Sequence, residues 1–164
     1  MSNEIRILQL ADRDTILQYE RQKLLGVEPD DMERQMLEWH APWRTEALEH
    51  YLPLGWSFSV LSEEVGADGV RGMEGYFLAQ PQIFTRGLTQ TLWIERIQFN
   101  SGEVLSALLE VAYKLCREKH FQQLLVGESP SLKTAMSEAS SLNELLSKFE
   151  KIEDGVLGIK TAKF

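Results

Sequence analysis

The chain has 164 residues, of which 43% are hydrophobic and 26% are charged, and its formal net charge is −8 at pH 7. This length is typical of one folded unit, so we expect residues 1–164 to form a single domain. The negative charge disfavours nucleic-acid partners, and there is no run of about 20 apolar residues, the length needed to cross a bilayer. One cysteine, Cys116, excludes an internal disulfide bond, and the N-terminus lacks the pattern of a secretory signal. These features predict a cytoplasmic protein without nucleic-acid or membrane partners.

The first elements are a strand and a helix. Apolar residues between positions 5 and 10 predict the strand. A helix follows from about Arg13 to Leu25, with Asp12 as a candidate N-terminal cap and Gly26 at its end.

A second helix is expected to begin at Asp30 or Asp31. Its large apolar residues recur at three- and four-residue steps and so lie along one side: Met32, Met36, Trp39 and Trp43. Such a stripe could line a ligand pocket, but packing of an amphipathic helix on a sheet is the favoured interpretation. Pro42 is expected to kink or divide this segment.

Three strands in an antiparallel meander are predicted next, at residues 56–60, 70–84 and 89–99. Pro81 must lie at a bulge, an edge or a break in the second of them. Strict alternation along the third strand gives two faces. One face carries Leu92, Ile94, Arg96 and Gln98, and the other carries Thr91, Trp93, Glu95, Ile97 and Phe99.

A helix with a wide apolar stripe follows over residues 104–116, capped by Asn100 or Ser101. A buried strand at 122–126 comes after it, and a helix between two strands permits parallel pairing. Ser129 is then expected to cap a helix that runs to Phe149 and is broken around residues 140–141. The chain ends in a strand pair bent at residues 154–155.

Metal and thiol chemistry are not indicated. His40, His50 and His120 lie far apart and have no second ligand at metal spacing, so no metal site is expected. Cys116 lies on the apolar stripe of its helix, which predicts a buried, unreactive thiol.

The order of these elements resembles the GNAT superfamily of N-acyltransferases over nearly the whole chain. The most telling match runs from Thr91 to Val126, a strand, a short loop, the helical segment Ser106–Ala112 and a second strand. The resemblance implies an α+β (or α/β) fold with a mixed, mostly antiparallel central sheet flanked by helices on both faces. It also implies transfer of an acetyl group from acetyl-coenzyme A to a small amine or a protein amine.

The resemblance also implies where a site would lie. The family holds the pantetheine arm of coenzyme A along the central strand, and the pyrophosphate at the following helix N-terminus, where backbone N–H groups are unsatisfied. On this chain the positions concerned are Arg96, Ile97, Gln98 and Phe99 for the arm, and Asn100, Ser101, Gly102 and Glu103 for the phosphates.

Two side chains are the catalytic candidates. Glu95 matches the carboxylate that removes a proton from the amine, although a lone glutamate is more often ion-paired or solvent-facing. Ser129 could donate a hydrogen bond to the thiol, with helix capping as the simpler alternative. The tyrosine that many members carry on the late helix is absent between Ser131 and Phe149.

The phosphate loop departs from the family pattern of Arg or Gln, two residues, Gly, one residue, then Gly or Ala. Asn100, Glu103 and Leu105 occupy the three defined positions. Glu103 adds a negative charge near a polyanion and Leu105 adds bulk. The sequence therefore leaves two functions open: an acyltransferase dependent on acetyl-coenzyme A, or a catalytically inactive GNAT-like binding or interaction module that has lost coenzyme A binding.

Overall fold

The structure, a computed structural model, describes residues 4–85, 87–139 and 143–161. These residues form a seven-stranded sheet of order β1-β2-β3-β4-β5-β7-β6. The strands are β1 Glu4–Ile7, β2 Phe58–Val65, β3 Arg71–Thr85, β4 Leu88–Phe99, β5 Gln123–Gly127, β6 Glu150–Glu153 and β7 Val156–Lys160. Only β4 and β5 pair in parallel, and the other neighbours are antiparallel. The predicted mixed, mostly antiparallel sheet is confirmed.

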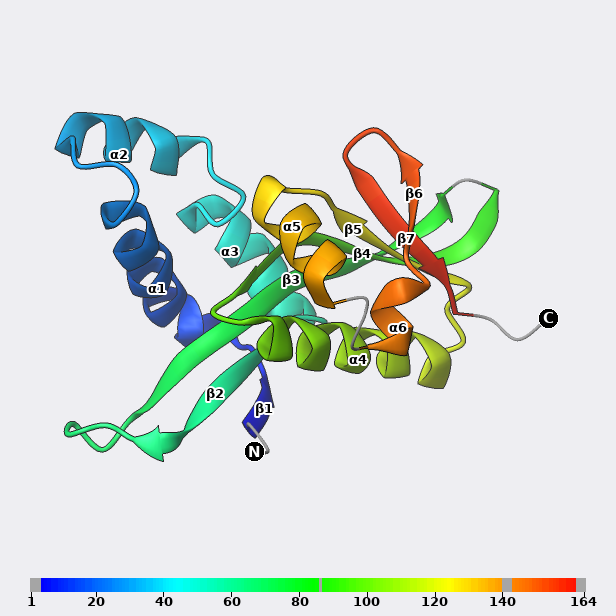
Figure 1. Ribbon diagram of the computed structural model, residues 1–164, viewed down its shortest axis with the longest axis horizontal. Coiled ribbons are helices and arrows are strands. Elements are labelled where there is room, and N and C mark those ends of the chain that lie inside the picture. The colour runs from blue at the N-terminus through cyan, green and yellow to red at the C-terminus, as the bar shows by residue number, and fades with distance from the viewer. Residues whose placement is uncertain (1–3, 86, 140–142, 162–164) are drawn as a thin grey trace.

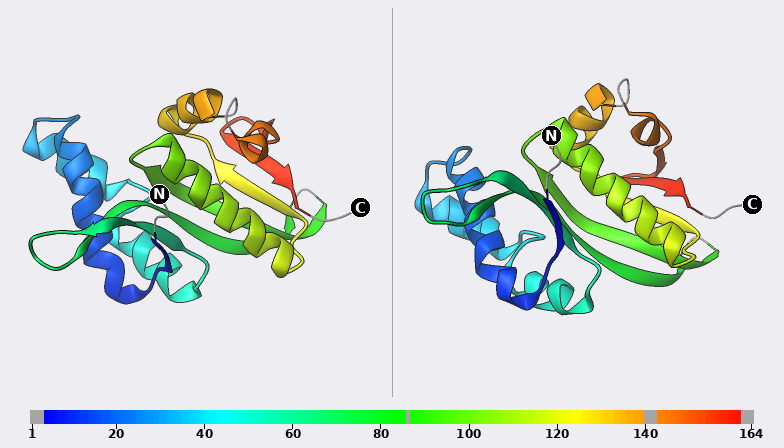
Figure 2. Two further views of the ribbon diagram at one scale, coloured as in Figure 1. Left: turned by 60° about the horizontal axis from the view of Figure 1, so that its bottom comes forward. Right: turned by 90° about the horizontal axis from the view of Figure 1, so that it is seen from below.

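Helices cover both faces of this sheet, as expected. They are α1 Arg13–Leu25, α2 Asp31–Trp39, α3 Thr45–Tyr51, α4 Gly102–Glu118, α5 Pro130–Ala139 and α6 Glu144–Ser147, with short 3-10 turns at Leu10–Asp12 and Leu52–Leu54. Figure 2 shows α1 and α3 on one face and α4 on the other. Alternate residues of β3 enter the two cores, because Tyr76 and Leu78 pack with α1 and α3 while Phe77 packs with α4.

A β-bulge interrupts the pairing of β3 with β4. Leu78 lies opposite Arg96 and Ala79 lies opposite Ile94, so Glu95 is an extra residue in β4. The bulge resets the alternation: Ile97 joins Ile94 in the core beneath α4, whereas Arg96 faces α1. The strict alternation predicted from the sequence is therefore wrong beyond Glu95.

The apolar stripe of α2 does not pack on the sheet, contrary to the sequence-based expectation. No residue of α2 is buried, and the side chains of Met32 and Trp39 are 71% and 67% exposed. Figure 1 shows α2 at one end of the molecule, and of the predicted stripe only Trp43, beyond the end of α2, enters the core.

Three smaller features bear on the predicted ends of elements. Asp12 does not cap α1; its carboxylate accepts hydrogen bonds from the Gln9 N–H and from Arg6. The helix expected to reach Phe149 is divided into α5 and α6, and the predicted break at 140–141 lies outside the described residues. Pro81 pairs only with β4, beyond the end of β2, which confirms its place at an edge.

Cys116 is buried, and burial raises the pKa of its thiol to about 12, as expected for an unreactive residue. Among the described residues no helix is both long and apolar enough to cross a membrane.

Gly75 of β3 allows α4 to approach the sheet. A Cβ atom at this position would lie 2.6 Å from Cγ1 of Val104 and 2.7 Å from the carbonyl oxygen of Gln98. We expect Gly75→Ala to lower the free energy of unfolding by about 1–3 kcal/mol because the added methyl group overpacks this contact. Urea denaturation measures the effect, and Gly72→Ala, whose added Cβ meets nothing within 4 Å, is the control. Equal stability of the two variants would contradict the packing argument.

Candidate active site

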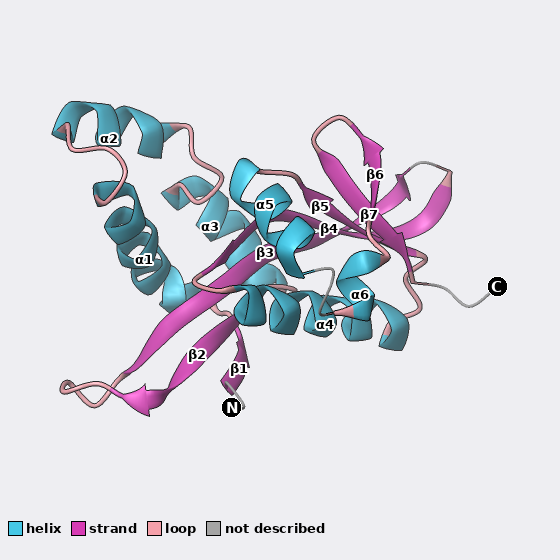
Figure 3. Ribbon diagram, viewed as in Figure 1, coloured by secondary structure: helices cyan, strands magenta, loops and turns pink. Residues whose placement is uncertain are grey.

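The two parallel strands β4 and β5 separate near their C-terminal ends. Their pairing runs from Thr91 opposite Gln123 to Ile94 opposite Val126 and stops there. β4 continues to Phe99 with β3 as its only strand partner among the described residues (Figure 3). Backbone N–H and C=O groups on the open edge of β4 are thus available to an extended ligand. β4 and β5 therefore leave an opening between them beyond Ile94 and Val126.

A hollow of about 200 Å³ lies beside this opening. Four segments distant in sequence line it: Pro42 between α2 and α3, residues Trp93, Glu95, Arg96 and Ile97 of β4, Gly127 at the end of β5 with Glu128 and Ser129 after it, and Gly155 between β6 and β7. The Glu128 N–H donates to the Gly155 carbonyl at 2.7 Å, which ties two of these segments together.

Glu95 is held inside the hollow by one neighbour on the same strand. The indole Nε1–H of Trp93 donates to Oε2 of Glu95 at 2.7 Å. The second carboxylate oxygen makes no hydrogen bond with the described residues, so it remains open to a ligand. A half-buried carboxylate that is fixed in this way can accept a proton from a bound group.

Arg96 contributes its backbone to the site, but its side chain serves another purpose. Its guanidinium donates to Oε2 of Glu20 in α1 at 2.9 Å. Burial is the largest single effect and lowers the pKa of Arg96, but the charges and hydrogen bonds of Glu20 and Tyr76 together outweigh it, so the net pKa is raised. The positive charge of Arg96 is therefore balanced by the carboxylate of Glu20 in α1 and not by that of Glu95.

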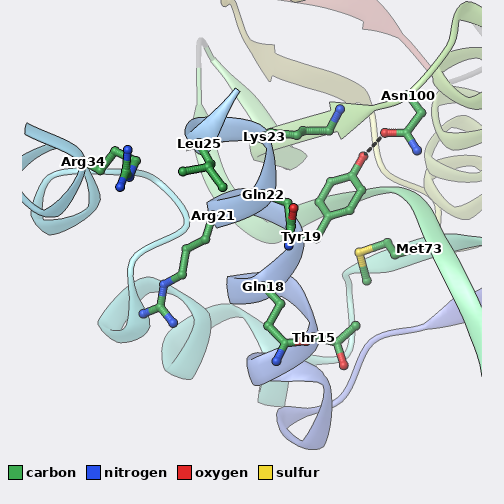
Figure 4. Close-up of a pocket in the computed structure, with 10 residues that line it drawn as sticks. All are labelled: Thr15, Gln18, Tyr19, Arg21, Gln22, Lys23, Leu25, Arg34, Met73 and Asn100. Atoms are coloured by element: carbon green, nitrogen blue, oxygen red, sulfur yellow. Dashed lines mark hydrogen bonds between the residues drawn. The ribbon is translucent and has the colours of Figure 1, made fainter. Parts of the chain in front are cut away.

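The loop that leads to α4 uses two of its side chains for the fold. Asn100 accepts a hydrogen bond from the Tyr19 hydroxyl at 2.8 Å (Figure 4) and donates to Glu74 at 2.9 Å. Ser101 caps α4 by accepting from the Val104 N–H at 3.3 Å, which confirms one of the two caps considered. Gly102 and Glu103 form the exposed first turn of α4, whose N–H groups are not used by the helix.

The two mismatches in the loop differ in their consequences. Leu105 is 0% exposed and belongs to the core beneath α4, so its side chain does not enter the loop as its place in the pattern suggested. Glu103 is exposed and has no ion-pair partner among the described residues. Of these two mismatches, only the charge of Glu103 thus opposes a phosphate at this helix N-terminus.

Ser129 performs the structural role considered for it. Its hydroxyl oxygen accepts from the Leu132 N–H at 3.2 Å and so caps α5, and it lies 3.3 Å from the Ser131 hydroxyl. Ser129 also lines the hollow, so a contact with a bound thiol remains a proposal.

Sequence reasoning missed Tyr51 of α3. Burial and the nearby negative charge of Glu95 raise the pKa of Tyr51 to about 12, so its hydroxyl keeps its proton at neutral pH. Nothing in the sequence marks this relation, because α3 and β4 are brought together only by the packing of α3 on the sheet.

A larger depression of about 860 Å³ lies along α1 (Figure 4). Its two arginines have partners: Arg21 pairs with Glu38 at 2.6 Å, and Arg34 pairs with Asp31. No carboxylate lines it, and the described residues contain no group of three metal-ligating side chains anywhere. The smaller hollow beside β4, which Glu95 and Glu128 line, is therefore the candidate site for acid–base chemistry.

Comparison with known proteins gives a likeness in structure alone. No family model matches the chain. No curated protein sequence matches it either. The PaiA N-acetyltransferase of Thermoplasma acidophilum, solved in complex with coenzyme A, matches with a TM-score of 0.65 and 14% identity over 98% of this chain and 99% of that one.

Two further solved structures show the same likeness. A GNAT-family acetyltransferase of Listeria monocytogenes has a TM-score of 0.60 and 16% identity, covering 96% of this chain and 94% of its own. The polyamine N-acetyltransferase of Drosophila melanogaster has a TM-score of 0.54 and 12% identity, covering 85% and 82%. The chain thus has a GNAT-like fold.

Proposed function

We propose that the protein transfers an acetyl group from acetyl-coenzyme A to an amine in the hollow between β4 and β5. One observation carries the proposal: at the bulge in β4, the carboxylate of Glu95 and an unpaired backbone edge face the same hollow. The fold supports it, since similar structures include one with coenzyme A and one named for acetylation of polyamines. Because fold does not decide function, the site residues bear the weight of the argument.

Most of the residues present fit coenzyme A. The open edge of β4 from Arg96 to Phe99 offers main-chain groups to the pantetheine arm, and the N–H groups of Gly102 and Glu103 offer donors to phosphate. The nearest atom to a Cβ built on Gly102 is Cβ of Ala139 at 3.9 Å, so the first turn of α4 is not crowded. The Glu103 carboxylate is unfavourable for phosphate, and the Glu74 carboxylate, which accepts from Asn100 at 2.9 Å, adds a second negative charge beside the loop.

The protein's own residues would handle the proton of the acceptor. The amine nitrogen would attack the thioester carbonyl carbon of acetyl-coenzyme A, so that a C–N bond forms, the C–S bond breaks and coenzyme A leaves as the free thiol after its sulfur takes up a proton. The open oxygen of Glu95 would take the proton that the amine nitrogen loses, while Trp93 holds the carboxylate in place. The hydroxyl of Ser129 is the candidate donor to the thiol sulfur.

The charge of the hollow suits a cationic acceptor. Glu95 and Glu128 both line it, whereas the only arginine in the lining, Arg96, is neutralised by Glu20. A small amine or the amine of a protein is protonated at neutral pH and is attracted by this negative field.

The second candidate is a GNAT-like binding module without coenzyme A. It is favoured by Glu103 at the phosphate position and by Asn100, whose side chain is already engaged by Tyr19 and Glu74. Titration calorimetry with acetyl-coenzyme A and coenzyme A separates the two candidates. Binding by the native chain supports the transferase, and binding by neither the native chain nor Glu103→Gln would favour the module.

We expect Glu103→Gln to bind coenzyme A about five- to tenfold more tightly, because like charges about 4 Å apart repel by 1 kcal/mol or more. Glu118→Gln is the matched control, since it changes the net charge equally at the opposite end of α4. An equal gain in both variants would show a general charge effect and contradict a phosphate site at Glu103.

A further inference from the structure

A buried ion pair lies directly behind the bulge in β4. Glu20 of α1 is 2% exposed, and its Oε2 accepts from Arg96 at 2.9 Å. The fully buried ring of Tyr76 lies beside them on β3. Oε1 of Glu20, the hydroxyl of Tyr76 and Nε of Arg96 make no hydrogen bond of good geometry among the described residues, although the Tyr76 hydroxyl interacts with the charges of both Glu20 and Arg96.

Stability does not account for this cluster. Burying two charges incurs a desolvation penalty that their attraction often fails to recover, and apolar replacements of buried ion pairs are frequently neutral or stabilising. Buried polar atoms without partners add a further penalty. The presence of this cluster is better explained if its polar contacts select one backbone conformation over another.

The conformation concerned is the bulge. Arg96 immediately follows the extra residue Glu95, and it lies opposite Leu78 on the face covered by α1. Without the bulge, alternation would turn Arg96 toward the apolar core beneath α4, where Ile94 and Ile97 lie. The attachment of Arg96 to Glu20 therefore favours the bulged register over the regular one.

We propose that Glu20 is a positioning residue for Glu95: through Arg96 it holds the bulge in β4 and keeps the Glu95 carboxylate on the indole of Trp93. Glu20 does not line the hollow, so it acts on the site only through β4. The geometric part of the proposal stands on its own, whereas its consequence for catalysis rests on the proposed acetyl transfer.

The test is nuclear magnetic resonance of the full chain without ligand, so it does not depend on coenzyme A binding. The chain has four tryptophans, and Trp93→Phe identifies the Trp93 indole N–H signal. In Glu20→Gln we expect this signal to move away from its hydrogen-bonded position. Hydrogen exchange at the indole and at the backbone amides of 95–97 should become about tenfold faster.

The matched control is Glu38→Gln. Like Glu20→Gln, this substitution removes the carboxylate partner of an arginine. Here the arginine is Arg21 of α1, which pairs with Glu38 of α2 at 2.6 Å, and the pair does not involve β4. The Trp93 signal and the exchange rates should match the native protein in this variant.

A folded Glu20→Gln variant with native signal and exchange rates overturns the proposal. If Glu20→Gln does not fold, Glu20→Asp keeps the charge but shortens its reach, and a smaller shift in the same direction is expected. Loss of folding in both variants would show that the pair serves stability alone, which also overturns the proposal. Absence of coenzyme A binding would remove the proposed transferase and leave the result on Glu20 intact.

Discussion

Replacement of Glu95 by glutamine is expected to lower the turnover number of acetyl transfer by about 10²–10⁴-fold, the range typical of a lost general base. Glutamine keeps the size of the side chain and can still accept the Trp93 hydrogen bond, but it cannot take a proton from the amine. Release of free thiol from acetyl-coenzyme A with a panel of primary amines measures the rate. Calorimetry should show unchanged affinity for coenzyme A, because Glu95 is assigned no contact with it.

Glu128→Gln is the control for this prediction. Glu128 lines the same hollow, so the substitution changes the local charge equally, but Glu128 has no hydrogen bond to Trp93. We expect a weaker apparent affinity for the amine and a turnover within about tenfold of the native value. Equal losses of turnover in the two variants would show that the field of the hollow, and not a base at Glu95, limits the reaction.

Truncation of Leu105 to alanine is expected to lower the free energy of unfolding by about 2–5 kcal/mol, the range for buried leucines. The side chain is fully buried in the core that α4 forms with the sheet, so its removal leaves a cavity. Chemical denaturation followed by circular dichroism measures the change. A change below about 0.5 kcal/mol would show that the Leu105 side chain is not part of the core and lies in the phosphate loop instead.

Leu37→Ala is the matched control, since Leu37 is half exposed on α2 and belongs to neither core. The free energy of unfolding of Leu37→Ala should remain within about 0.5 kcal/mol of the native value.

The burial of Leu105 also decides which substitutions in the phosphate loop are useful. Glycine at both 103 and 105 would restore the family pattern but remove a core residue, so neutralising Glu103 alone is the cleaner change.

The order of elements was predictable because it follows from local patterns. The helix that becomes α4 has a full apolar stripe and a capping serine at its start, and both features act within a few residues of one another. The strands that become β3 and β4 are marked by alternation and by the turns between them. α2 was misjudged, since an amphipathic stripe predicts a helix but does not say what covers it.

The sequence by itself determined the elements, the resemblance to GNAT enzymes and the nomination of Glu95 and the loop after β4. Only the tertiary structure decided the β4 bulge, the turn of Arg96 toward Glu20, the burial of Leu105 and the approach of Tyr51 to the charge of Glu95. The physical reason is that periodicity is a local property of the backbone. A bulge, a buried ion pair and a hollow arise from the register between strands and the packing of distant segments, which no local pattern encodes.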